Sequence, residues 1–271
     1  MRDTLGQRVV VAVDGSAASW ATASLAAEEA RLRHRPLQLI SAASEMSGGL
    51  GPYLTAVVGR LSARWPEVAI TTRVLDGDIT ERLIDESRWA TLVVVGRDAA
   101  NGRHYQVAAH TFCPAMVVPA AVGQTAGGPV LLGVDMSPYD EQAIGFAFEQ
   151  AALRGVPLVA VHVWSGIPGT ALSDINPFAY NLCQARTTAD RLLAETLAGW
   201  TEKYPNVPVQ RMALYDVNPA RTLLQAAADA GLVVVGANRF GTTSPQLLGP
   251  VARVLLDHAP CAVCVVRQTS R

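Results

Sequence analysis

Short unbroken runs of apolar residues recur along the chain, separated by longer segments that mix polar and apolar residues. VVVAV occupies 9–13 and LVVVG occupies 92–96, and similar runs return as VLLGV at 130–134 and LVVVG at 232–236. Runs of Val and Leu without alternating polar residues are typical of strands buried on both faces of a sheet. The pattern therefore predicts a parallel sheet that is covered by helices on both sides.

The segments between the apolar runs have helical periodicity, so strand and helix alternate throughout. This alternation predicts a doubly wound α/β fold with right-handed crossovers. In the second half we expect Ser137 to cap a helix whose first turn holds Pro138, with Asp140 as the acid of a capping box. We expect strands near 8–13, 37–42, 68–75, 91–96, 114–118, 130–134, 157–163, 207–214, 231–236 and 261–266, and helices up to 31 and near 50–64, 79–89, 102–112, 138–154, 180–203, 219–229 and 250–258.

The chain is an internal repeat. Asp14 and Asp135 each follow the first apolar run of their copy, and they are 121 positions apart. The two LVVVG runs are 140 positions apart, and His110 and His258 are 148 positions apart. The growing offset places a gain of 19 residues in the second copy, mostly at 164–183. It also places a loss of 8 residues in the first copy, just after its LVVVG run.

The repeat divides the chain into two expected domains, residues 1–120 and residues 128–271. The segment 119–129, PAAVGQTAGGP, is rich in small residues, Pro and Gly, and has no periodicity, as is typical of a linker. The last strand of each copy is apolar and would lie at a sheet edge, where an exposed strand readily pairs. We therefore expect these two strands to pair antiparallel about a pseudo-two-fold axis.

The composition narrows the functional classes. Half of the 271 residues are hydrophobic, 17% are charged and the net charge is −1, which favours a folded core and argues against disorder and against nucleic acid as a partner. The apolar run near the N-terminus is too short for a signal peptide or a membrane span, so we expect a cytoplasmic protein. Cys261 and Cys264 lie three apart in an apolar strand, which predicts two core cysteines on opposite faces.

Taken together, the paired openings VVVAVDGS and VLLGVDMS, the repeated LVVVG and the ending HAPCAVCVVR resemble the universal stress protein family over nearly the whole chain. The resemblance implies two tandem domains, each a five-stranded parallel sheet of the adenine nucleotide alpha hydrolase-like type. It also implies a role in stress survival and signalling, often without catalytic activity. Many members bind ATP, and they commonly dimerise through their fifth strands.

The ATP pattern of that family is Gly, two residues, Gly, nine residues, Gly, and then Ser or Thr. Here Gly236 matches the first glycine and Gly249 the third, but Arg239 stands at the second and Pro250 at the hydroxyl position. Pro supplies neither a hydroxyl nor a backbone N–H. The side chain of Arg239 either obstructs the close approach of the backbone or contacts a phosphate itself.

Other positions of the resemblance fall at the ends of the first two strands. Asp135 matches the family's Asp, which can accept a hydrogen bond from a ribose or a base, and Val163 matches the residue that contacts adenine. In the first copy Asp14, Ala42 and Gly96 are the weak counterparts, because the shortened loop removes most of the phosphate cradle. Such loops bind phosphate through backbone N–H groups and a helix N-terminus.

We therefore expect a stress-response or regulatory protein, not an enzyme, whose second domain binds ATP, with Mg²⁺ accompanying the nucleotide. The alternative is a scaffold that binds no nucleotide and acts through protein contacts, with the inserted segment 164–183 as one candidate surface. A slow ATP hydrolase is a third reading, although no general base with a partner is evident. We also expect either a homo-oligomer or an intramolecular pseudo-dimer, and neither a metal site nor a membrane partner.

Overall fold

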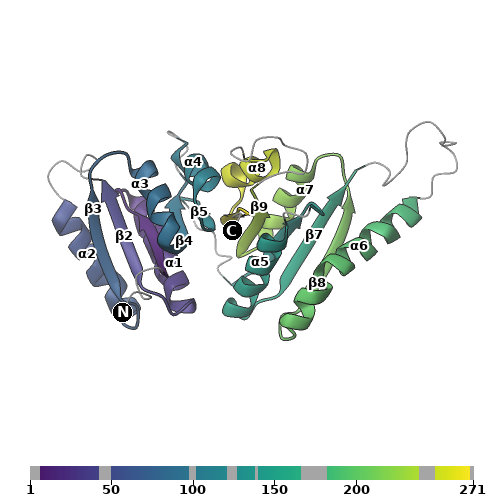
Figure 1. Ribbon diagram of the computed structural model, residues 1–271, viewed down its shortest axis with the longest axis horizontal. Helices are drawn as coiled ribbons and strands as arrows, with labels where there is room; N and C mark the ends of the chain where they lie inside the picture. The colour runs from purple at the N-terminus through teal and green to yellow at the C-terminus, as the bar shows by residue number, and fades with distance from the viewer. Residues whose placement is uncertain are drawn as a thin grey trace.

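The computed structural model describes residues 7–42, 50–97, 102–120, 127–137, 140–165, 182–237 and 248–268. Ten strands form one continuous sheet in the order β3-β2-β1-β4-β5-β10-β9-β6-β7-β8 (Figure 1). In the first half the strands are β1 (Arg8–Ala12), β2 (Leu37–Ala42), β3 (Ile70–Leu75), β4 (Ala90–Gly96) and β5 (Ala115–Val118); in the second they are β6 (Val130–Val134), β7 (Leu158–Trp164), β8 (Val209–Tyr215), β9 (Leu232–Gly236) and β10 (Ala262–Val266).

The helices alternate with the strands as the sequence predicts. They are α1 (Ala17–Leu32), α2 (Leu50–Arg64), α3 (Ile79–Glu86), α4 (Arg103–His110), α5 (Glu141–Arg154), α6 (Leu182–Lys203), α7 (Pro219–Ala226) and α8 (Pro250–His258). In both halves the expected long third helix ends early and continues as a 3-10 turn, at Ser87–Trp89 and at Ala227–Asp229. The shared 3-10 turn shows how closely the two halves repeat each other.

The two halves join through their last strands. β5 and β10 pair antiparallel, with Met116 opposite Cys264 and Val117 opposite Val263, whereas every other pairing in the sheet is parallel. This confirms the expected pairing, and the strand order on either side of it is symmetric. Apolar edge strands are prone to pair with another chain. Here each of the two edges covers the other within a single chain.

Helices cover both faces of the sheet (Figure 1). One core contains Leu61 of α2, Phe148 of α5 and Leu193 of α6, and it lies between the sheet and α1, α2, α5 and α6. The other contains Val107 of α4 and Leu255 of α8, and it lies beneath α3, α4, α7 and α8. Because both cores run across the β5–β10 junction, the two halves share apolar packing as well as strand hydrogen bonds.

Cysteine placement follows the alternation of side chains along a strand. Cys264 belongs to the first of these cores and Cys261 to the second, so the two thiols lie on opposite faces, as predicted. Burial raises the pKa of the Cys261 thiol to about 11. Both cysteines are therefore core residues and do not form a metal or redox pair.

Several of the sequence predictions concern positions outside the described residues. They are Pro138 in the first turn of its helix, Arg239, most of the inserted segment 164–183, and the middle of the expected linker, 121–126. The expected domain boundaries at 120 and 128 stay predictions. Among the described residues, no helix combines the length and the apolar composition needed to cross a membrane.

Candidate functional site

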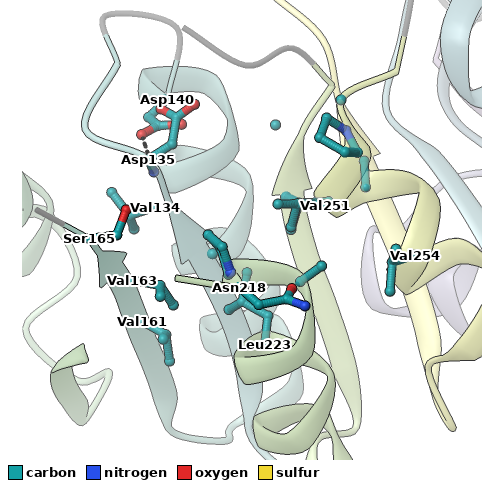
Figure 2. Close-up of a pocket in the computed structure, with 18 of the residues that line it drawn as sticks. Val134, Asp135, Asp140, Val161, Val163, Ser165, Asn218, Leu223, Val251 and Val254 are labelled. Atoms are coloured by element: carbon teal, nitrogen blue, oxygen red, sulfur yellow. Dashed lines mark hydrogen bonds between the residues drawn. The ribbon is translucent and has the colours of Figure 1, made fainter. Parts of the chain in front are cut away.

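A cavity of about 550 Å³ opens at the carboxyl ends of β6, β7 and β9, and we call it the C-terminal cavity. Cavities at this edge of a parallel sheet are the usual ligand sites of doubly wound folds. Its size falls within the range typical of small-molecule sites, about 300–1,000 Å³. The residues that line it are Gly133, Val134, Asp135, Asp140, Val161, Val163, Ser165, Val217, Asn218, Pro219, Ala220, Leu223, Val235, Gly236, Gly249, Pro250, Val251, Ala252 and Val254 (Figure 2).

The turn after β6 carries the polar end of the cavity. The Asp135 carboxylate accepts a hydrogen bond from the Ser137 N–H at 2.8 Å. Between them, Met136 adopts a left-handed backbone conformation with φ 63°, where the first half has Gly15 with φ 81°. A residue with a Cβ is uncommon in this region of backbone space. The tight turn is therefore retained in the second half without its glycine.

Asp140 is a site residue that the sequence did not assign to the cavity. We expected the helix to begin at Pro138 with Asp140 in its first turn, but α5 begins at Glu141 and Asp140 is its N-cap residue. The Asp140 carboxylate turns back and accepts a hydrogen bond from the Asp135 N–H at 3.0 Å (Figure 2). The offset of 121 that relates Asp14 to Asp135 also relates Ser19 to Asp140, and this signal could have found it.

The two carboxyl groups at this end of the cavity interact electrostatically. Burial, followed by the nearby negative charge of Asp135, raises the pKa of the Asp140 carboxyl to about 7. In the first half, the equivalent contact is neutral, because the Ser19 hydroxyl accepts a hydrogen bond from the Asp14 N–H at 3.0 Å and donates one to the Asp14 carboxylate. The second half has thus gained an acid that is protonated below neutral pH.

The wall of the cavity is apolar. Val161 and Val163 of β7 point into it from one side, and Leu223 of α7 approaches from another (Figure 2). Val163 is the residue that the sequence assigned to this wall. The contribution of α7, which also brings Asn218 to the cavity, was not predicted, because nothing in the sequence marks which helix packs against the ends of these strands.

The third part of the cavity is the start of α8. Gly236, Gly249 and Pro250 all line it, as the sequence predicted, and Gly249 is the N-cap residue. The Gly249 N–H donates to the Ala237 carbonyl at 2.9 Å, and Pro250 has no N–H to offer. In the described part of the chain, the first backbone N–H at this helix end that has no acceptor is therefore that of Val251.

A second, smaller cavity of about 340 Å³ occupies the equivalent place in the first half, and we call it the N-terminal cavity. Asp14 and Gly96 line it. Ala42, the last residue of β2, is buried and is not among the described lining residues, so its expected role stays a prediction. Burial tends to raise the pKa of Asp14, but hydrogen bonds from Ser19 and Ser16 outweigh it and hold that pKa below its ordinary value.

Metal-binding geometry is not evident at either cavity. In the described ranges, no group of three or more His, Cys, Asp or Glu side chains is placed to hold a metal ion. The ring of His162, the histidine on β7, contacts the Val134 carbonyl oxygen at 2.9 Å, which holds it against the sheet backbone. What the C-terminal cavity offers is therefore an apolar wall, two carboxyl groups and a helix N-terminus.

Comparison with known proteins gives a consistent result. Residues 128–267 match the family model described as the universal stress protein family. A universal stress protein of Mycolicibacterium smegmatis is 34% identical over 289 residues, covering 96% of each chain, and one of Mycobacterium tuberculosis is 32% identical over 292 residues, covering 96% of this chain and 97% of the other. The crystal structure of a universal stress protein from Archaeoglobus fulgidus superposes with a TM-score of 0.65 at 14% identity, covering 98% of this chain and 99% of that one.

Proposed function

Because the chain belongs to the universal stress protein family, whose membership supports a role in the stress response, we propose that its C-terminal cavity binds an adenine nucleotide, ATP in the first place. The observation that carries the proposal is a convergence of positions. Five residues from four separate parts of the sequence line one cavity: Asp135, Val163, Gly236, Gly249 and Pro250. Gly236, Gly249 and Pro250 stand at positions of the family's ATP pattern, and Asp135 and Val163 match the family's Asp and its adenine-contacting residue.

The chemistry of the cavity suits the three parts of the ligand. The apolar wall at Val161 and Val163 matches the face of an adenine ring. The Asp135 carboxylate can accept hydrogen bonds from ribose hydroxyls, which gain from a charged acceptor. The phosphates then extend toward the N-terminus of α8, where the N–H of Val251 and the helix dipole favour negative charge.

The charge of the cavity sets a further requirement on the ligand. Among its described lining residues, the ionisable ones are Asp135 and Asp140, and both are acids. A triphosphate therefore needs a cation from elsewhere, and we propose that Mg²⁺ bound to the nucleotide supplies it, together with the side chain of Arg239. Protonation of Asp140 reduces the negative charge at the other end of the cavity.

We further propose that the chain is a binding and regulatory protein and does not turn ATP over. The ionisable residues that line the cavity, Asp135 and Asp140, belong to the turn after β6 and the start of α5, whereas the phosphates in this arrangement lie at the start of α8. A general base has to reach the attacking water within hydrogen-bond distance. Assay of ATP hydrolysis with saturating ATP and Mg²⁺ tests this part separately, and sustained turnover would contradict it.

The experiment that tests binding begins with the freshly purified protein. Its nucleotide content is measured by heat release and chromatography, and ATP is then titrated by calorimetry. Asp135→Ala should weaken binding by about tenfold or more, because a hydrogen bond to a charged group contributes about 1.5–3 kcal/mol. Asp190→Ala, which removes an exposed carboxylate on α6, is the matched control and should leave the affinity unchanged. Absence of binding at millimolar ATP would overturn the proposal.

A further inference from the structure

The N-terminal cavity differs in chemistry from its counterpart in the second half. Arg103 and His104 line it where the C-terminal cavity has Val251 and Ala252, at the same offset of 148 that separates the two histidines His110 and His258. The C-terminal cavity is walled by apolar residues at this end, whereas the N-terminal cavity is walled by basic ones. The repeat has thus produced two cavities with different ligand requirements.

Arg97 adds a second guanidinium to the N-terminal cavity. It follows directly after β4, and its backbone N–H donates to the Val118 carbonyl at 2.7 Å. Its Nη2 donates to the Ala259 carbonyl at 2.6 Å, which fixes the side chain across the junction between the halves. Its Nε is buried and has no acceptor within the described part of the chain.

Hydroxyl groups line the rest of the N-terminal cavity. Four hydroxyl side chains contribute to its surface: Ser16, Ser19, Thr22 and Thr80. The position of Thr80 corresponds to Ala220 in the C-terminal cavity. Asp14 is the acid among the described lining residues. The N-terminal cavity therefore combines two guanidinium groups, an imidazole and several hydroxyls with a single carboxylate.

We propose that the N-terminal cavity binds a small phosphate monoester that carries hydroxyl groups, such as a sugar phosphate, and not ATP. Arginine guanidinium groups are well suited to phosphate oxygens because their donors match them in pairs. A phosphate monoester carries close to two negative charges at neutral pH and would compete for Arg97 and Arg103 with the acids already near them, Asp257 and Asp78. This site is separate from the proposed ATP site, and the proposal does not depend on it.

The single carboxylate defines the other end of the ligand. Asp14 is ionised at neutral pH and would repel a phosphate, so the phosphate lies at the Arg97 and Arg103 side. A ligand hydroxyl can donate to Asp14, as the Ser19 hydroxyl already does. The volume of about 340 Å³ against about 550 Å³ in the second half sets an upper limit to the ligand. A ribose-sized phosphate satisfies both conditions.

Calorimetric titration of the full chain tests the proposal with ribose 5-phosphate as the probe and inorganic phosphate as the second titrant. We expect ribose 5-phosphate to bind with a dissociation constant of about 1 mM or below, and Arg103→Gln to weaken it about tenfold or more. Arg186→Gln, which changes an exposed arginine on α6 in the same way, is the matched control and should bind as the unchanged chain does. Binding should also weaken as ionic strength rises.

Several results would overturn the proposal. It fails if neither titrant binds at about 10 mM, or if Arg103→Gln leaves the affinity unchanged. Inorganic phosphate binding as tightly as ribose 5-phosphate would remove the role given to Asp14. If Arg103→Gln does not fold, Arg103→Lys replaces it: this change keeps the charge and loses the paired donors, so an intermediate loss of affinity is expected.

Discussion

The carboxylate of Glu29 in α1 and the guanidinium of Arg154 in α5 form a buried ion pair that joins the two halves of the chain. Glu29 also accepts hydrogen bonds from Gln150 at 2.9 Å and from Arg33 at 3.2 Å. Gln150 and Arg154 follow Glu29 and Arg33 by the repeat offset of 121, so equivalent residues from the two halves meet. Gln150 stands where an exact repeat of Glu29 would place a second Glu. The amide avoids the repulsion that two facing carboxylates would cause.

Removal of this carboxylate should destabilise the whole chain. Glu29→Ala leaves two nearly buried guanidinium groups without a central partner, and loss of one member of a buried pair costs about 3–5 kcal/mol. Glu28→Ala, one residue earlier and half-exposed, is the control and should cost less than about 1 kcal/mol. Urea denaturation measures both, and similar losses for the two variants would show that the cluster does not hold the halves together.

Asp140 should make stability depend on pH. Its folded-state pKa of about 7 lies above the ordinary value of 3.8, so between about pH 4 and pH 7 the folded chain keeps a proton that the unfolded chain releases. Its contribution to stability should therefore fall as pH rises through this window, by at most about 1.4 kcal/mol per pH unit, and stay level above pH 7. Asp140→Ser, which restores the residue type of Ser19, should remove this dependence.

The pH test compares denaturation of the unchanged chain and of Asp140→Ser at pH 5 and pH 8. The variant should gain stability relative to the unchanged chain at the higher pH. Asp190→Ser, at an exposed position on α6, controls for the loss of an acid as such. A difference between the chains that is the same at both pH values would contradict the assignment of the titration to Asp140.

The backbone of Met136 should be strained, since it adopts φ 63° beside Asp135. Met136→Gly relieves this strain but loses the packing of the side chain, which accepts a hydrogen bond from Thr196 at its sulfur. Met136→Ala loses the same packing and keeps the strain. We therefore expect the Gly variant to be more stable than the Ala variant by about 0.5–1 kcal/mol, although Gly is ordinarily the less stabilising residue. Thermal denaturation of the two variants decides the order.

Pro250 should limit affinity for ATP in the C-terminal cavity. Pro250→Ser supplies a backbone N–H and a hydroxyl at the first turn of α8, and a hydrogen bond to a charged phosphate contributes about 1.5–3 kcal/mol. We expect ATP affinity to rise about tenfold in calorimetric titration. Pro219→Ser makes the same change at the start of α7, which lines the same cavity, and should have little effect. An equal gain from both variants would show that the phosphates do not lie at α8.

The resemblance predicted much of the C-terminal cavity. Parallel strands that alternate with helices bring their carboxyl ends to one edge of the sheet, so Asp135, Val163 and Gly236 had to lie near one another once their strands were identified. Ala42 shows the limit of this reasoning. It ends β2 as Val163 lies near the end of β7, but it is buried and is not among the described residues that line the smaller cavity.

The residues that sequence reasoning missed depend on contacts between distant elements. Asp140 became a cavity residue because α5 begins three positions later than expected and the side chain turns back to the Asp135 N–H. Leu223 and Asn218 reach the cavity because α7 packs over the ends of the second-half strands. Neither a helix start that is shifted by local hydrogen bonds nor the direction of helix packing is encoded in hydrophobic periodicity.

The order of apolar runs and the repeat offsets were sufficient for the α/β class, the strands, the two copies and the pairing of the last strands, because these follow from local periodicity and from the need to cover apolar edges. Only the tertiary structure decided that Glu29 meets Arg154, that Asp140 faces Asp135, and that Arg97 and Arg103 line one cavity. These relationships join residues from separate elements, and their energies depend on burial and distance, which the order of residues does not contain.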